Sequence, residues 1–353
     1  MAAHPAPSST ARLCRIVGAL LSPPGEARQM RLDVLCRDAE ALDAVAHAAV
    51  LHGVDRFLVE GLAVTSPAPA MLRSLRARAM MQTAAIEHRL IRPLWRALAA
   101  LDAAHVTVVA LKGPVLAARL LGDLCARESN DLDLLIAPAD YPAAMAALLG
   151  TGWTTHDSQT TPPVTKALHH ATLHEPASGA CLELHYSPGT DAGIAWPVAK
   201  MIARAPTVTV DGRAVRVLDP ADEFVFLATH GLKHQLRRLQ WLLDLALLAR
   251  QVDLAAVERR ARELGALHVV RLARHVCTVM FGVSWLPGAA WRVAPRMRYD
   301  AARALLDAGG RNLLGGLARK ALQLVVADWP GGTLRTLLAA ASRARLRVAL
   351  ARA

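Results

Sequence analysis

Aromatic residues are scarce in this chain of 353 residues: only four Phe and three Tyr are present, and Phe, Tyr and Trp together make up 4% of the chain. Proteins that bind single-stranded nucleic acid stack its bases on aromatic side chains, and few such platforms are present here. The sequence also lacks Arg-Gly-Gly tracts and stripes that combine basic with aromatic residues. Nucleic acid is therefore a partner that the composition leaves open but that no motif indicates.

Cysteines are few, and none is placed to form a pair. The five cysteines are odd in number and widely spaced, without a Cys-x-x-Cys motif: Cys14, Cys36, Cys125, Cys181 and Cys277. This spacing argues against a zinc knuckle and against a small domain held together by disulfides. A reducing cytoplasm is the expected location.

Long apolar runs are also missing. Arg96, Asp102 and Asp244 interrupt the best candidates for a membrane-spanning helix, which needs about 20 predominantly apolar residues. The N-terminal residues lack a basic stretch followed by a long apolar core, and residues 16–21 are too short for the core of a signal peptide. We expect a cytoplasmic protein that is peripheral to a membrane at most.

Positive charge is what the chain has in excess, with a formal net charge of +12. Such a charge fits an anionic partner, for example a nucleotide, tRNA or a membrane surface. Arginine greatly outnumbers lysine, is scattered along almost every predicted helix and accompanies abundant alanine, as is typical of a GC-rich genome. The charge alone therefore identifies no partner.

Alanine and leucine supply most of the 54% of residues that are hydrophobic, and both favour helices. A chain of this length can bury a substantial core, and no repeat of fixed period is evident. The apolar spacing predicts an α+β protein with three regions. These are a helical region over residues 1–104, an αβ core over 105–218 and a second helical region over 219–353.

Helices are predicted throughout the first region once the chain becomes ordered after residues 1–10. Helical spacing extends over residues 10–62, with a break at Pro23-Pro24-Gly25. A Pro-rich turn at residues 65–69 then precedes one long helix over residues 70–104. We expect that helix to pack against the sheet of the middle region.

The middle region alternates strands and helices. Residues 105–111 form a predicted strand, and residues 114–121 a helix with Pro114 in its first turn. Asp211-Gly212 is the predicted turn of a hairpin over residues 207–217. The remaining predicted elements are a helix over 139–149 and strands at 132–136, near Trp153, at 171–174 and at 180–186.

Asp131 and Asp133 alternate with aliphatic residues in the segment Asp131-Leu132-Asp133-Leu134-Leu135-Ile136. The two-residue period of a strand places both carboxylates on one face. Adjacent acids repel each other, and a cation between them relieves the repulsion; hard oxygen ligands suit Mg²⁺. The pair predicts metal-assisted phosphoryl or nucleotidyl transfer, although a strand with acids on its solvent face has the same pattern.

A phosphate site is predicted just upstream, at Lys112-Gly113-Pro114. The strand over residues 105–111 ends there, and a helix begins at Pro114. Backbone amides at a helix start attract anions, and Lys112 adds a positive charge nearby.

These residues resemble the bacterial uncharacterised nucleotidyltransferase family of the DNA polymerase β-like nucleotidyltransferase superfamily. The shared pattern is a strand ending in Leu-Lys-Gly, a helix, an Arg, an Asp-x-Asp strand, another helix and a later strand that bears an acid. The resemblance covers about residues 105–245 and places the pattern at Lys112, Gly113, Arg127, Asp131, Asp133 and the strand 180–186. It implies a small mixed β-sheet core flanked by helices.

The resemblance also implies roles for individual residues. Glu183 would be the third acid, either a ligand of Mg²⁺ or the base for the attacking hydroxyl, and it shares a strand face with Cys181 and His185. A solvent-facing glutamate is the alternative. Arg127 would fix the loop or a phosphate, and Lys233 would reach the triphosphate from the following helices, unless it is an ordinary surface charge.

The implied activity is transfer of a nucleoside monophosphate from a nucleoside triphosphate, such as ATP, to a hydroxyl group. Asp131, Asp133 and Glu183 would hold two Mg²⁺ ions, and the acceptor would be a sugar, a peptide, a protein side chain or an RNA end. The chain departs from the superfamily at Gly113-Pro114, which replaces the usual Gly-Ser and removes both a hydroxyl and an amide. This departure keeps a second hypothesis open, a non-catalytic basic module that binds RNA or a protein.

A helix is predicted to begin at Asp219-Pro220 and to run to about Arg250. Four polar residues recur on it at helical spacing and share one face: His230, Lys233, His234 and Arg237. His230 and His234 could bind zinc, but no third ligand is evident. His169, His170 and His174 are expected at loops and strand edges rather than in a metal cluster.

The basic tail, residues 335–353, is expected to form an amphipathic helix with a solvated face, with membrane or RNA contact as the alternative.

Overall fold

The computed structural model describes residues 9–63, 69–155, 169–189, 194–234, 236 and 238–283. These residues form two compact units. The first contains the described parts of Met1–Met81, His230–Gln251 and Arg271–Arg319, and the second those of Gln82–Thr229 and Val252–Val270. Within the described residues, no helix is long and apolar enough to cross a membrane.

The first unit is helical. It contains α1 (Ser9–Leu20), α2 (Glu26–Leu35), α3 (Ala39–His52), α4 (Asp55–Ala63) and α11 (Leu239–Leu248). The predicted break at Pro23-Pro24-Gly25 separates α1 from α2. Ser9 and Thr10 belong to α1, so the predicted disorder is wrong for these two residues, and residues 1–8 lie outside the described part. The C-terminal tail, residues 335–353, also lies outside it.

The predicted long helix over residues 70–104 is present as α5 (Pro69–Ile86), a π-helical turn (Glu87–Ile91) and α6 (Arg92–Ala103). The amide of Arg92 donates to the carbonyl of Glu87, five residues earlier, instead of four. Pro93 follows directly and has no amide to donate, which explains a widened turn at this point.

The second unit is built on a four-stranded mixed sheet of order β1-β2-β4-β3. Its strands are β1 (Val108–Ala110), β2 (Leu132–Ile136), β3 (His170–Glu175) and β4 (Ala180–His185). β2 and β4 are parallel, whereas β1 pairs with β2 and β3 pairs with β4 in antiparallel fashion. The predicted α+β class with a small mixed sheet and flanking helices is therefore confirmed. The predicted strand near Trp153 is only an isolated bridge, between Thr154 and His174.

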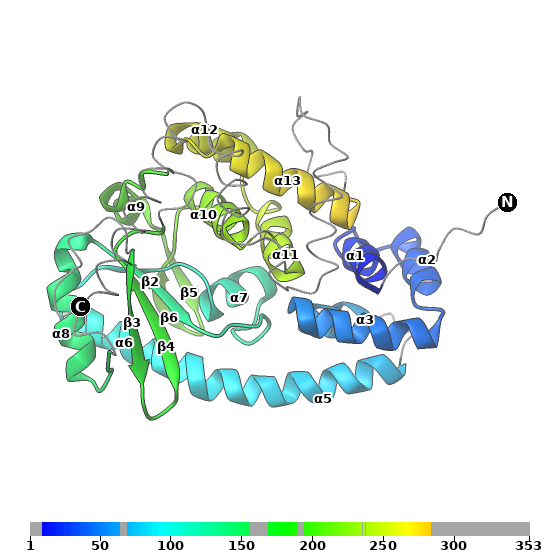
Figure 1. The fold of residues 1–353 in the computed structure, drawn as a ribbon, viewed down its shortest axis with the longest axis horizontal. Helices are drawn as coiled ribbons and strands as arrows, with labels where there is room; N and C mark the ends of the chain where they lie inside the picture. The colour runs from blue at the N-terminus through cyan, green and yellow to red at the C-terminus, as the bar shows by residue number, and fades with distance from the viewer. Residues whose placement is uncertain are drawn as a thin grey trace, which may run out of the picture. The chain divides into compact units, whose positions relative to one another are not determined.

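One face of this sheet carries the apolar core. Leu132, Leu134 and Leu182 pack there with residues of α6 and of α8 (Tyr141–Gly150), which follows a 3₁₀ turn at Pro138–Asp140. Figure 1 shows these two helices beside the sheet. Because side chains alternate along a strand, Asp133 and Glu183 belong to the opposite face.

The second unit contains further elements. They are α7 (Pro114–Leu121), α9 (Val198–Arg204), the hairpin β5 (Thr207–Val210) and β6 (Arg213–Arg216), and α12 (Leu254–Leu264). The bounds of α7 are those predicted. The hairpin turns at Asp211 and Gly212, both with positive φ, as an Asp-Gly turn requires. A bridge between Ala110 and Val217 joins the segment after β6 to β1.

The helix predicted from Asp219 to about Arg250 is wrong in its length, because α10 (Pro220–Lys233) ends before α11 begins. Leu236 has a left-handed φ of 52°, and its amide donates to the carbonyl of Gly231 at 2.7 Å. A hydrogen bond of this kind, from an amide to the carbonyl five residues earlier, commonly ends a helix. The predicted helical face therefore stops at Lys233, and Arg237 lies outside the described residues. The last described helix is α13 (Leu267–Phe281).

Candidate active site

Asp131 and Asp133 lie at the start of β2, where the sheet meets the end of β1. The amide of Leu111 donates to the carbonyl of Asp133 at 3.0 Å, which holds the two segments together. The side chain of Asp133 has no exposed surface, whereas that of Asp131 is 34% exposed. One carboxylate is thus enclosed by protein and the other is accessible from solvent.

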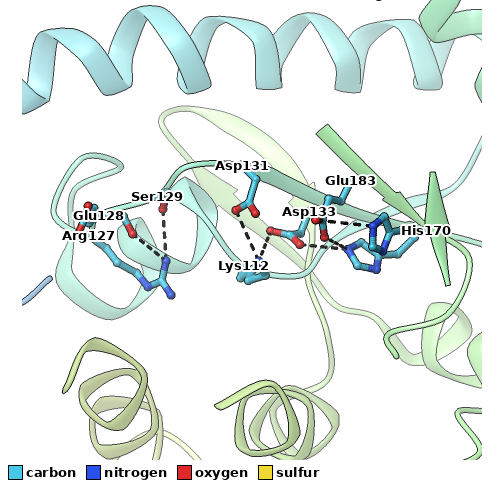
Figure 2. Close-up of polar contacts among 9 residues, drawn as sticks. Lys112, Arg127, Glu128, Ser129, Asp131, Asp133, His170 and Glu183 are labelled. Atoms are coloured by element: carbon cyan, nitrogen blue, oxygen red, sulfur yellow. Dashed lines mark hydrogen bonds and ion pairs between the residues drawn. The ribbon is translucent and has the colours of Figure 1, made fainter. Parts of the chain in front are cut away.

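Lys112 pairs with both aspartates. Its ammonium nitrogen lies 2.8 Å from Oδ2 of Asp133 and 3.6 Å from Oδ1 of Asp131, and Figure 2 shows it facing both carboxylates. The sequence predicted this lysine beside a phosphate. In the structure its ammonium group lies beside the two carboxylates, where a positive charge relieves their mutual repulsion.

Glu183 lies directly beside Asp133, because the parallel pairing of β2 with β4 sets these two residues opposite each other. The structure therefore places two of the three acids named from the sequence side by side, and Lys112 links the third, Asp131, to Asp133. The side chain of Glu183 is 28% exposed, so it is reachable from solvent. Glu175, an acid on the neighbouring strand β3, is bound instead by Arg96 and Ser178.

His185 is a member of the site that the sequence reasoning did not select. Its Nε2 atom lies 3.1 Å from Oδ1 of Asp133 and 3.2 Å from Oε2 of Glu183, so one imidazole joins two of the acids. Nε2 of His170 lies 3.7 Å from Oε1 of Glu183. The alternation of Cys181, Glu183 and His185 on one strand face was the signal that could have identified it.

Opposing charges shift the ionisation of this cluster. Burial alone would raise the pKa of Asp133, but Lys112 and His185 outweigh it and hold that pKa well below its usual range. Burial and the charge of Asp133 raise the pKa of Asp131. Burial would lower the pKa of His185, but its hydrogen bonds to Asp133 and Glu183 raise it. The cluster thus stabilises buried negative charge by means of nearby cations.

Gly113 links Lys112 to the start of α7. Its φ of 76° and ψ of −144° lie in a region that residues with a Cβ rarely adopt. Space is not the reason, because a Cβ here would make an ordinary contact, 3.4 Å from the carbonyl oxygen of Asp131. Glycine therefore allows the chain to turn from the lysine into the helix close to the Asp131 backbone.

Arg127 is buried in the loop between α7 and β2. Its Nη1 atom donates to the carbonyl of Glu128 at 3.2 Å and to Oγ of Ser129 at 3.3 Å, as Figure 2 shows. These bonds tie the side chain to its own loop, and both expected roles of Arg127, fixing the loop or a phosphate, stay predictions. Lys233, the last residue of α10, belongs to the other compact unit, so its contact with a triphosphate stays a prediction.

The chemistry of the donor atoms fits a magnesium ion, although Asp131 lies outside the compact group that Asp133 and Glu183 form with His185. Asp131, Asp133 and Glu183 supply carboxylate oxygens, the ligands that Mg²⁺ prefers, and the ammonium of Lys112 already lies between two of them as a positive charge. Among the described residues, two groups of three side chains have ligand atoms within 4.8 Å of one another: Asp133, Glu183 and His185, and His169, His170 and His185. Neither group includes His230 or His234, so zinc at that pair gains no support.

The family follows from comparison with known proteins. The family model described as uncharacterised nucleotidyltransferase matches residues 38–282, which are 245 of the 353 residues. The chain therefore belongs to this nucleotidyltransferase family. Neither the curated proteins nor the solved structures contain a significant match.

Proposed function

We propose that this protein is a Mg²⁺-dependent nucleotidyltransferase, which transfers a nucleoside monophosphate from a nucleoside triphosphate to a hydroxyl group. The observation that carries the proposal is the pairing of Asp133 with Glu183 across β2 and β4, with Asp131 two residues away on the same face. Membership of the family supports the general reaction. The acceptor is of unknown class, whether a sugar, a peptide, a protein side chain or an RNA end.

Asp131, Asp133 and Glu183 would hold the Mg²⁺, which when bound neutralises charge on the triphosphate and orients its α-phosphorus. The enclosed Asp133 suits a role as a fixed ligand. Glu183, with 28% of its side chain exposed, is the carboxylate that suits proton acceptance from the hydroxyl. The hydroxyl oxygen forms the new bond to the α-phosphorus, and pyrophosphate leaves with the electrons of the broken bond.

Lys112, Gly113 and Arg127 would serve the nucleotide. The ammonium of Lys112 would turn from the acids toward a phosphate oxygen when a nucleotide binds. The amides that follow Pro114 in the first turn of α7 would face the same phosphate. Arg127 would keep the loop before β2 in position. Lys233 would add a positive charge from α10.

Incubation with each α-labelled nucleoside triphosphate, Mg²⁺ and a cell extract tests the proposal. Wild-type protein should transfer label to one class of macromolecule or metabolite, and the Asp133→Asn variant should not. Equal labelling with both proteins would refute the assignment of the site.

A non-catalytic module that binds RNA or a protein is the second candidate, and Pro114 favours it because this residue offers no amide to a phosphate. Calorimetry separates the two functions. The proposed enzyme should bind a nucleoside triphosphate much more tightly when Mg²⁺ is present, whereas a basic scaffold should show no such dependence.

We also propose a cytoplasmic location. None of the five cysteines forms a disulfide, and four of them are buried, which suits a reducing compartment.

A further inference from the structure

Three histidines gather where β3 begins and β4 ends. His170, the first residue of β3, pairs with His185, the last residue of β4, and His169 directly precedes β3. The ring centroids of His169 and His170 are 4.6 Å apart, those of His170 and His185 5.0 Å and those of His169 and His185 5.7 Å. Three imidazoles thus share one small volume beside the carboxylate cluster.

The spacing of the ring nitrogens suits a transition-metal ion after a small movement. One nitrogen from each ring lies within 4.8 Å of the other two. Ligands about 2.0–2.1 Å from a tetrahedral zinc ion are about 3.4 Å from one another. Side-chain rotations that move the ring nitrogens by roughly 1 Å would bring the three histidines to this spacing. Imidazole nitrogens bind ions such as Zn²⁺ and Co²⁺, whereas Mg²⁺ prefers oxygen.

A second observation comes from the two nitrogens of His185. Its Nε2 atom faces Asp133 and Glu183, and its buried Nδ1 atom has no hydrogen-bond partner. Metal-binding histidines usually donate one ring N–H to a carboxylate and coordinate through the other nitrogen. With the proton on Nε2, the lone pair of Nδ1 is the one available to an ion.

We propose that His169, His170 and His185 form a second metal site, which takes a Zn²⁺-class transition-metal ion and is chemically distinct from the carboxylate site for Mg²⁺. The ion ties the start of β3 to the end of β4. It also fixes the imidazole of His185, so that Nε2–H keeps Asp133 and Glu183 in place. The site does not depend on the proposed transfer reaction.

The test uses metal content rather than activity. Full-length protein without an affinity tag is stripped with a chelator and exchanged into metal-free buffer. It is then titrated with Co²⁺, a spectroscopic probe for zinc sites, in excess Mg²⁺, while visible absorption reports coordination by nitrogen. Elemental analysis after Zn²⁺ loading and gel filtration gives the stoichiometry.

Four variants locate the ion. His169→Ala and His170→Ala each remove a proposed ligand, His174→Ala is a matched change elsewhere on β3, and Asp131→Asn alters only the carboxylate site. We expect one ion per chain in the wild type, His174→Ala and Asp131→Asn proteins. Affinity should fall about tenfold or more in the other two, since loss of even a supporting contact costs about 10- to 100-fold.

Two results would overturn the proposal. One is the absence of a tightly bound ion from the wild-type protein. The other is an ion that survives in His169→Ala and His170→Ala but is lost from Asp131→Asn, which would place it on the carboxylates. His169 precedes the strand and is only half-buried, so its replacement should leave the sheet pairing intact. Circular dichroism of each variant checks that the fold is retained. Because no nucleotide is present, these outcomes are independent of whether the protein transfers nucleotides.

Discussion

Glu183 lies beside Asp133 in the parallel register of β2 and β4, although 50 residues separate them along the chain. This pairing turns an Asp-x-Asp strand into a three-carboxylate cluster. Lys112 and His185 contact Asp133 from two sides, so each oxygen of the buried carboxylate has a partner. The same contacts decide how each acid should respond to mutation.

Asp131→Asn and Asp133→Asn should both abolish transfer but differ in stability. Loss of a metal ligand should cost about 4 kcal/mol or more in the transition state, which is about a thousandfold in rate. Asp133→Asn also leaves the buried ammonium of Lys112 without its closest partner and should lower the free energy of unfolding by about 3 kcal/mol. Asp131 is 34% exposed, so its replacement should change stability little.

Rate assays with labelled nucleotide and urea denaturation of both variants measure these effects. Near-normal turnover in both would remove the aspartates from the reaction. Equal stability of the two variants would show that the pair between Lys112 and Asp133 contributes little to folding.

Glu183→Gln should slow transfer about 10²- to 10⁴-fold, the usual contribution of a general base, while the two aspartates keep binding of the Mg²⁺ nucleotide. Rates at saturating nucleotide, combined with calorimetry, separate the two effects. Cys181→Ala, two residues earlier on the same face of β4, is the matched control and should retain full activity. Unchanged turnover in Glu183→Gln would assign proton acceptance to another group.

Glu175 should make stability depend on pH. Burial would raise its pKa, but hydrogen bonds from Arg96 and Ser178 outweigh burial and hold the pKa below the ordinary value. A carboxylate whose pKa is lowered in the folded state stabilises the fold at pH values above its pKa in the unfolded chain, about 4.3. That contribution is lost as pH falls through the folded-state value.

The free energy of unfolding should therefore be about 1–2 kcal/mol lower in Glu175→Gln than in wild type near pH 7, as expected for hydrogen bonds to a charged group. The difference should narrow below about pH 4.3. Denaturation curves across pH 3–7 measure it. A difference that is constant with pH would mean that the charge of Glu175 is not what stabilises this contact.

Gly18→Ala should destabilise the helical unit. A Cβ at this position of α1 would lie 1.8 Å from the carbonyl oxygen of Phe281, at the end of α13, so one of the two helices must shift. Overpacking of this kind costs about 1–3 kcal/mol. Gly150→Ala, in α8 with open space around the new Cβ, should instead be neutral or stabilising by up to about 1 kcal/mol. Thermal melts compare the two, and a stable Gly18→Ala protein would contradict the close approach of these helices.

Local signals in the sequence determined several elements and their faces. Pro114 marks the start of α7, Asp211-Gly212 marks a hairpin turn, and the alternation of Asp131 and Asp133 with leucine shows which face carries the acids. Each of these depends on a few adjacent residues, so the sequence suffices. The family resemblance added Glu183 to the list of acids.

Tertiary structure alone decided which of these residues meet. The register of β2 against β4 and of β3 against β4 depends on packing between distant segments, so no local pattern predicted that His185 would join Asp133 to Glu183. No local pattern predicted that His169 and His170 would lie against His185 either. The end of α10 was missed for a similar reason, because Leu236, neither Gly nor Pro, adopts the left-handed conformation through its bond to Gly231. The sequence by itself determined the faces of the strands, and the pairing of the strands decided the site.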